Sequence, residues 1–389
     1  MEYKGDERVM VNFAFNLQSA PQFPWIGMET STGIANPGLS VWMFQAPTRV
    51  FGITTPTGLD RWVQCFNIFA LVLLFFLIAH YVPRGEQEVW IWALILMCFN
   101  PMAILFSRKI WAQCVLVPFT VCFLGAWWRR DRNWGALLWG LSGLLLGQIH
   151  ISGLFLTLAL FLWTATFRRQ GVRWKAWLIG SAIGMIGVVQ WLRLVHGQKN
   201  QKFDWHHFIS IQYWRYWISD SVGIDLNYSL QSFAFNDFWK SPFFGDRPTY
   251  LVGALHVLLY AFIIILICLM LFKVIRERQK WLEVLKGSYS DTHFLLSAVL
   301  LGYGVLITAS GSLVKHHYLI VAYPMLWVWL AQISFTHLKR PRQWLFAVAL
   351  AQALISVGFL TYIHQNHGAP GDSDYGVTYG AQRAAGTDE

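Results

Sequence analysis

Four groups of polar residues stand out in an otherwise apolar chain. The first is the acidic pair Asp6 and Glu7 in the opening stretch MEYKGDERVM. An acidic pair near a terminus is usually a solvated surface feature. A carboxylate at a membrane surface, beside a groove of low dielectric constant, can instead act as a general base that takes the proton of a hydroxyl group. We predict that Asp6 is such a base and that Glu7 supports it or the acceptor.

The second and third groups are basic and lie at the ends of apolar runs. They are Arg108 and Lys109 in LFSRKIW, and Lys315, His316 and His317, followed by Tyr318, in SLVKHHYLIVAYP. Basic residues near the ends of membrane helices often do no more than extend their charged heads into water. The charge distribution described below should, however, deplete these turns of basic residues. We therefore predict that they bind an anion, and a phosphate group in the membrane interface is the expected ligand.

The fourth group is a single histidine, His150 in LLGQIHISG, between two apolar runs. A packed, hydrogen-bonded role and a ligand-binding role are both open for it. The histidines elsewhere show no zinc-binding spacing, so we predict no metal site and no certain cofactor, with a divalent metal ion left open. No glycine-rich phosphate loop, serine-nucleophile elbow or dinucleotide fingerprint occurs.

The composition identifies the surroundings in which these residues must act. Of the 389 residues, 56% are hydrophobic and only 13% are charged, and the mean hydropathy is +0.42. Soluble domains carry about 25% charged residues. The apolar runs are long and continuous, which favours helices that cross a lipid bilayer over alternating strands. The net charge of +10 comes with basic residues in short loops, a pattern of membrane topology that predicts no nucleic-acid partner.

We therefore expect an all-α, polytopic transmembrane helical bundle with ten spans. They are Trp62–Val82, Val89–Phe106, Ile110–Trp127, Trp134–His150, Ile151–Phe167, Trp174–Val195, Tyr250–Phe272, His293–Ser310, Tyr318–Phe335 and Trp344–Ile363. The predicted organisation is an N-terminal outer loop (1–61), helices (62–195), a large aromatic outer loop (196–249), further helices (250–363) and an outer tail (364–389). The two outer loops form a cap over the bundle.

The basic residues predict the orientation. If residues 1–61 lie outside, the short inner loops hold 16 of the 30 basic residues, as expected for the cytoplasmic side. The acidic pair, both basic turns, the aromatic loop and the tail then share the outer face. An exported segment of this length needs a signal, so we expect one more span upstream of Met1. We predict a multi-pass protein of the inner membrane with its active site on the outer face.

The combination predicts a reaction at that outer face, where nucleotide sugars are absent. A sugar linked to a polyprenyl phosphate would be the donor. Asp6 would take the proton of the acceptor hydroxyl, while Arg108, Lys109 and Lys315 would neutralise the phosphate that leaves.

The chain also resembles a known family over nearly its whole length. The acidic pair, NPGLSVWMFQAPTRVFG, SRKIWAQ, GLLLGQIHISG, KHHYLIVAYP and the tail GDSDYGVTYGAQ are similar to segments of the membrane-embedded GT-C glycosyltransferases. The most similar branch is the bacterial dolichyl-phosphate-mannose–protein mannosyltransferase-like group, with the aminoarabinose and lipopolysaccharide-core sugar transferases. The resemblance implies an inverting transfer to a glycolipid, glycan or protein, with Asp6 as the base and with Arg108 and Lys315 on the lipid phosphate.

Two alternatives use the same residues differently. A flippase or permease for a lipid-linked saccharide would need the basic turns and the aromatic loop but not Asp6. An enzyme like the O-antigen ligases or polymerases would place its reactive residues in a large late outer loop, for which 196–249 is suited.

Overall fold

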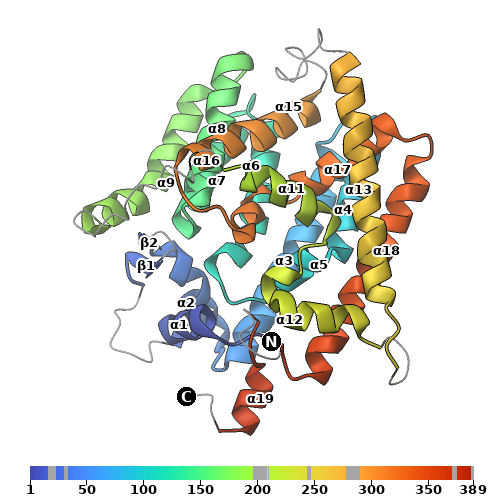
Figure 1. Ribbon diagram of the computed structural model, residues 1–389. Coiled ribbons are helices and arrows are strands. Elements are labelled where there is room, and N and C mark those ends of the chain that lie inside the picture. The colour runs from blue at the N-terminus through green and yellow to red at the C-terminus, as the bar shows by residue number, and fades with distance from the viewer. Residues whose placement is uncertain are drawn as a thin grey trace.

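The computed structural model describes residues 1–15, 23–29, 34–195, 208, 210–242, 247–276, 290–369 and 375–386. Over these residues the chain is helical apart from one small antiparallel sheet, formed by β1 (Ile26–Glu29) and β2 (Ala35–Pro37), and two isolated bridges. The predicted all-α class is confirmed. Figure 1 shows the helices surrounding one another in a single bundle, with the sheet beside α2 (Leu39–Phe51).

Within the described residues, five helices are long and apolar enough to cross a membrane, so the protein is a helical membrane protein. They are α3 (Pro56–His80), α9 (Trp174–Val195), α13 (Leu251–Arg276, apolar over Leu251–Lys273), the continuous run Asp291–Ala309 and α18 (Pro341–Gln365). The run 291–309 comprises α15 (Asp291–Ser297), the π-helical turn η3 (Ala298–Tyr303) and α16 (Gly304–Ala309). The number of ten spans stays a prediction.

Proline interrupts three of the apolar runs that we expected to be single helices. Val89–Phe106 divides into α4 (Gln87–Phe99) and α5 (Pro101–Phe106). Ile110–Trp127 divides into the 3₁₀ turn η1 (Ala112–Val115) and α6 (Val117–Trp128), and Tyr318–Phe335 into η4 (His316–Ala322) and α17 (Met325–His337), which bend by 77°. A proline lacks the backbone N–H and restricts the preceding residue, so a helix restarts there. Hydropathy alone does not report such breaks.

The start of the chain, α12 and the described part of the tail contact one another at one end of the bundle. Figure 1 shows α1 (Gly5–Phe15), α2, α12 (Asn227–Lys240), α19 (Tyr379–Ala384) and both chain ends in its lower part. Glu2 pairs with Thr378 in a bridge, and the Tyr375 amide donates to the Ser229 carbonyl at 3.0 Å. Residues 196–207, 209 and 243–246 of the aromatic loop, and 370–374 of the tail, lie outside the described residues. The membrane side on which this end lies stays a prediction.

Ion pairs join the loops that we predicted to face inward. Arg168 pairs with Asp291, and Arg130 lies 3.9 Å from the same carboxylate. Arg342 at the start of α18 donates to Glu88 at 2.9 Å. These contacts tie the ends of α6 and α8 (Ser152–Phe167) to α15, and the start of α18 to α4.

Small residues let α7 (Asn133–Ile149) and α9 approach closely. A Cβ atom added at Gly180 would lie 1.9 Å from the Leu137 carbonyl oxygen, and one at Gly140 would lie 2.4 Å from the Trp177 carbonyl oxygen. These neighbours are backbone atoms, which cannot rotate away.

We predict that Gly180→Val separates α7 from α9 and lowers the free energy of unfolding by about 3 kcal/mol or more, at the upper end of overpacking effects. Thermal unfolding of the detergent-solubilised protein measures this. Gly85→Val is the control, because a Cβ atom at Gly85 meets no atom within 4 Å. Equal transition temperatures for the two variants would contradict the close packing.

Candidate functional site

The basic turn after α5 places its two cations in different surroundings. Lys109 is fully buried, and its Nζ donates a hydrogen bond to Glu2 Oε1 at 2.7 Å; the Glu2 side chain is 2% exposed. The same ammonium lies 4.0 Å from the centre of the Trp111 ring. A buried charge needs such partners, because removal of one member leaves the other uncompensated. Lys109 therefore forms an internal ion pair with Glu2. Its surroundings differ in this respect from those of its neighbour Arg108.

Arg108 is half-buried and lines a cavity of about 810 Å³. The cavity walls come from Met1, the end of α18 and the tail, and include His364, His367 and Tyr375. Within the described part of the chain the Arg108 guanidinium forms no hydrogen bond or ion pair with the protein. Its donors are thus available to a ligand in the cavity.

The acidic pair is divided between surface and interior. Asp6 and Glu7 lie in the first turn of α1, where Asp6 is exposed and Glu7 is 1% exposed. Burial raises the pKa of Glu7 to about 7, although nearby Lys109 favours the charged form. Glu7 thus joins Glu2 and Lys109 in a buried cluster at the start of α1, while the Asp6 side chain is exposed.

The segment Lys315–Tyr318 lies at the start of η4, and its neighbouring side chains also differ in their surroundings. Lys315 is half-buried and, among the described residues, has no hydrogen bond or ion pair from its ammonium. His317 packs with its ring centre 5.7 Å from Trp111 and 4.9 Å from Tyr318. The basic turn at Lys109 and the segment at Lys315 therefore meet through the Trp111 ring.

His150 belongs to the same aromatic cluster. Its ring centre lies 5.2 Å from Tyr318 and 6.2 Å from His317, and its Nδ1 is 2.7 Å from the Ser152 hydroxyl. The side chain is 1% exposed. This is the environment of a packed, hydrogen-bonded histidine that supports the segment carrying Lys315.

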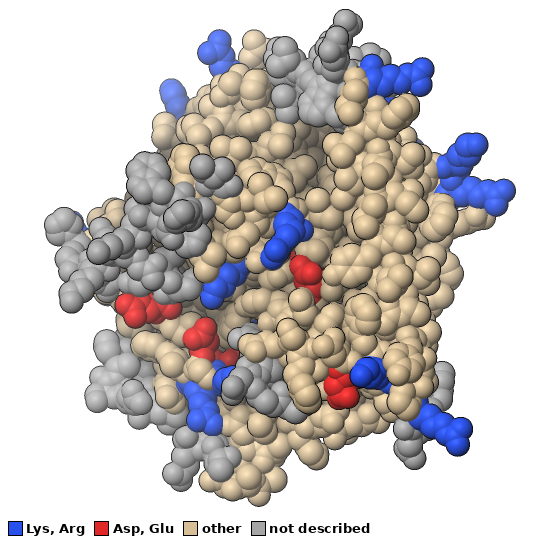
Figure 2. All heavy atoms as spheres, in the orientation of Figure 1, with Lys and Arg blue, Asp and Glu red and all other residues tan. Residues whose placement is uncertain are grey.

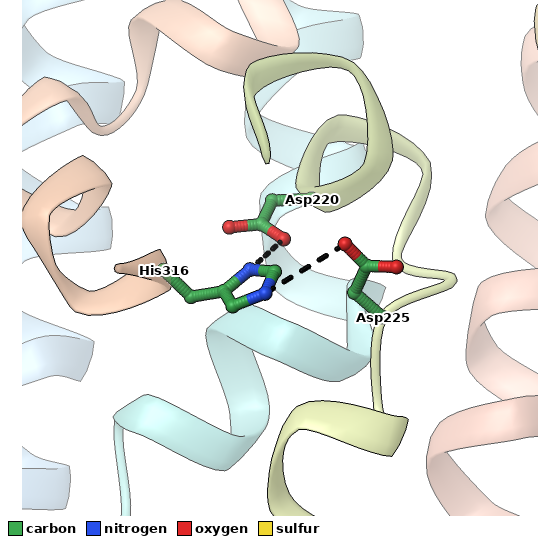
Figure 3. Close-up of side chains that lie close together, drawn as sticks. All are labelled: Asp220, Asp225 and His316. Carbon is green, nitrogen blue, oxygen red and sulfur yellow. Dashed lines mark hydrogen bonds and ion pairs between the residues drawn. The ribbon is translucent and has the colours of Figure 1, made fainter. Parts of the chain in front are cut away.

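His316 lies between two carboxylates that the sequence reasoning missed. Figure 3 shows its ring between Asp220, in the last turn of α11 (Gln212–Val222), and Asp225, in the loop before α12. His316 Nδ1 is 2.8 Å from Asp220 Oδ1, and Nε2 is 3.8 Å from Asp225 Oδ2. Burial raises the pKa of the Asp220 carboxyl to about 6, with His316 acting in the opposite direction. The available signal was the pair of aspartates in SDSVGIDLN, within a loop that otherwise drew attention for its aromatic residues.

A pocket of about 470 Å³ opens beside His316. It is lined by Arg215, Tyr216, Ser219, Asp225, Asn227, Tyr228, Tyr260 and His316. The Tyr216 and Tyr228 ring centres lie 3.8 and 4.8 Å from that of His316. The Tyr228 hydroxyl also lies 3.4 Å from His317 Nδ1. Because His317 and Lys109 both contact the Trp111 ring, this pocket is close to the buried Lys109–Glu2 pair. Figure 2 shows both acidic and basic side chains in the middle of a face that is otherwise largely uncharged.

Comparisons with known proteins add no assignment, since no protein-family model, no curated protein and no solved structure matches the chain.

The burial of Glu7 predicts a pH dependence of stability. Its pKa rises from the ordinary 4.5 to about 7 on folding, so the folded state holds a proton that the unfolded state releases in this range. The stabilisation is present below pH 4.5 and is lost as the pH rises through about 7. Glu7→Gln has no such titration, and its free energy of unfolding should fall less than that of the wild type over this range, by on the order of 2 kcal/mol.

Denaturant unfolding in detergent at several pH values measures the difference. Glu29→Gln, at an exposed position, should follow the wild-type curve. Parallel curves for Glu7→Gln and the wild type would show that Glu7 does not titrate in this way.

Proposed function

We propose that this protein is a membrane glycosyltransferase that moves a sugar from a polyprenyl-phosphate donor to an acceptor hydroxyl on a glycolipid, glycan or protein. The observation that carries the proposal is the arrangement of Arg108: a half-buried guanidinium with no ion pair among the described residues, which lines a cavity of about 810 Å³. The acidic pair on α1 lies at the same end of the bundle. The resemblance to GT-C enzymes points to the same reaction.

Arg108 supplies the donor phosphate site in this proposal. A guanidinium binds phosphate through parallel N–H donors. This interaction is stronger when the guanidinium is partly removed from water. The cavity beside Arg108 has room for a phosphate and its sugar. Lys315, near the aromatic cluster, is a second cation that forms no ion pair with the part of the chain that the structure describes. Lys109, which is paired with Glu2, stabilises the turn that carries Arg108 instead of contacting the donor.

Asp6 is the general base. The acceptor oxygen attacks the anomeric carbon while the bond from that carbon to the phosphate oxygen breaks. The hydroxyl proton passes to Asp6, and the electron pair of the broken bond leaves with the polyprenyl phosphate. Attack from the side opposite the phosphate inverts the anomeric centre. Exposure of Asp6 on α1 suits contact with an acceptor, and the buried Glu2–Lys109–Glu7 cluster fixes the start of that helix.

The site lies on the outer face of the inner membrane in this proposal. The basic residues concentrate in the loops at the other end, joined through Asp291 and Glu88. A donor carried by the membrane suits that location because it requires no soluble nucleotide sugar.

We predict that Asp6→Asn lowers turnover by about 10²–10⁴-fold with donor affinity retained, because the base acts in the transition state. Release of polyprenyl phosphate from a lipid-linked sugar by the purified protein is the measurement. Glu29→Gln, an exposed carboxylate in the same N-terminal segment, serves as the control and should keep its rate. Wild-type rates for Asp6→Asn would remove Asp6 from the mechanism, and lipid translocation without release would support the flippase instead.

We predict that Arg108→Ala and Lys315→Ala each weaken donor binding by roughly ten-fold or more, since a hydrogen bond to a charged group contributes about 1.5–3 kcal/mol. Binding of a polyprenyl phosphate to protein in nanodiscs measures this. Arg49→Ala, at an exposed position of α2, should bind as the wild type does. If both variants bind the donor normally, these side chains only extend into the interface.

A further inference from the structure

The cluster of Asp220, Asp225 and His316 has the donor atoms of a metal centre. One carboxylate oxygen from each aspartate and one imidazole nitrogen lie within 4.8 Å of one another. Among the described residues this is the one group of three or more such side chains with that spacing. It joins α11, the loop before α12 and η4, and its central pair is separated by 96 positions in the sequence.

The two nitrogens of His316 have different partners. Nδ1 lies at hydrogen-bonding distance, 2.8 Å, from Asp220. Nε2 lies 3.8 Å from Asp225 Oδ2, which is too far for a hydrogen bond. Histidines that bind metal commonly donate one ring N–H to a carboxylate, which leaves the other nitrogen as the ligand. His316 has this arrangement, with Asp220 as the outer partner and Nε2 directed to the pocket beside Asp225.

The gap between Nε2 and Asp225 has the width that an ion requires. Zinc lies about 2.0–2.2 Å from nitrogen and oxygen ligands, so two ligands at a tetrahedral ion are about 3.4 Å apart. The observed 3.8 Å needs to close by only a few tenths of an ångström. Ser219, Asn227 and Tyr228 line the same pocket, where water or a substrate oxygen can complete the coordination.

A separate observation also indicates a cation. Asp220 is 0% exposed, and its Oδ2 has no hydrogen-bond donor among the residues described. A buried carboxylate oxygen without a donor is costly, and a nearby positive charge offsets that cost. Arg215 is an exposed residue that lines the pocket and stacks 4.7 Å over Tyr216, so it lies close enough to contribute. An imidazole that binds an ion is neutral. In that state the two carboxylates and this guanidinium sum to one negative charge, which suits a divalent ion.

We infer that Asp225 and His316, positioned by Asp220, bind a divalent transition-metal ion of the zinc type. The mixed imidazole and carboxylate donor set favours Zn²⁺ over Mg²⁺, which prefers oxygen ligands and retains its water. The ion joins the loop before α12 to the start of η4, directly ahead of His317. This inference does not rest on the proposed glycosyl transfer, because the ion binds to the resting protein.

The test is metal binding by the full chain, purified in detergent without a histidine tag. After removal of metal by a chelator and dialysis against Zn²⁺, the protein should retain one ion per chain in mass-spectrometric metal analysis. Co²⁺ in its place should give the visible absorption bands of a low-symmetry four-coordinate site. Excess Mg²⁺ should not displace either ion.

Variants separate the roles of the three residues. Asp225→Asn and His316→Gln should each abolish stoichiometric Zn²⁺ retention and the Co²⁺ bands. Asp220→Asn should retain the ligands but weaken affinity by about 10–100-fold, as loss of an outer hydrogen-bond partner does. Asp237→Asn is the control: this carboxylate in α12 accepts a hydrogen bond from Tyr362 at 3.0 Å and should leave binding unchanged.

Asp225 is 17% exposed and lies in a loop, so Asp225→Asn keeps the test valid if His316→Gln fails to fold. Circular dichroism verifies the fold of each variant. Wild-type protein that retains no Zn²⁺ would overturn the inference, and the cluster would then be an ion pair between protonated His316 and the carboxylates. Zn²⁺ retained equally by Asp225→Asn and the wild type would overturn it too, since the ion would then lie elsewhere.

Discussion

A buried lysine paired with a carboxylate holds the N-terminal segment of this chain against the turn after α5. Lys109 is fully buried, and its hydrogen bond to Glu2 spans 107 positions in the sequence. A charge in apolar surroundings is tolerated only when its partner is in place. The segment before α1 must therefore lie against the turn after α5. The same segment pairs with Thr378, and the Tyr375 amide bonds to α12, so the N-terminal segment, the tail and the loop that carries α12 assemble around this pair.

This assembly determines which polar groups face a cavity. Glu7 is buried next to Lys109, and Asp6, one residue earlier, is exposed. Arg108, one residue before Lys109, faces the cavity of about 810 Å³. Adjacent residues in a helix or turn point in different directions, so one member of each pair supports the structure and the other can meet a ligand. Lys315 and His316 repeat this division: Asp220 holds His316, while the Lys315 ammonium has no hydrogen bond or ion pair with any residue that the structure describes.

Interrupted helices bring these groups to one end of the bundle. The breaks at Pro101 and Pro324 separate α5 from α4 and η4 from α17, so that Arg108 follows one short segment and Lys315 precedes the other. Their sequence neighbours Lys109 and His317 both contact Trp111. Backbone groups freed at such breaks need other partners in an apolar medium. Asn100 supplies them at the first break: its Oδ1 accepts from the Met102 and Ala103 amides, and its Nδ2 donates to the Asp220 carbonyl. The break is thereby linked to the helix that carries the Asp220–His316 pair.

The sequence by itself determined that the protein is an all-helical membrane protein, because the free energy of burying apolar runs in lipid depends on local composition. It also placed the basic turns at helix ends and singled out Asp6, Arg108 and His316. Only the tertiary structure decided that Lys109 pairs with Glu2, that Glu7 is buried, and that Asp220 and Asp225 meet His316. Those contacts join positions about a hundred residues apart. Their formation depends on where proline ends a helix and on which small residues let helices approach, and hydropathy reports neither.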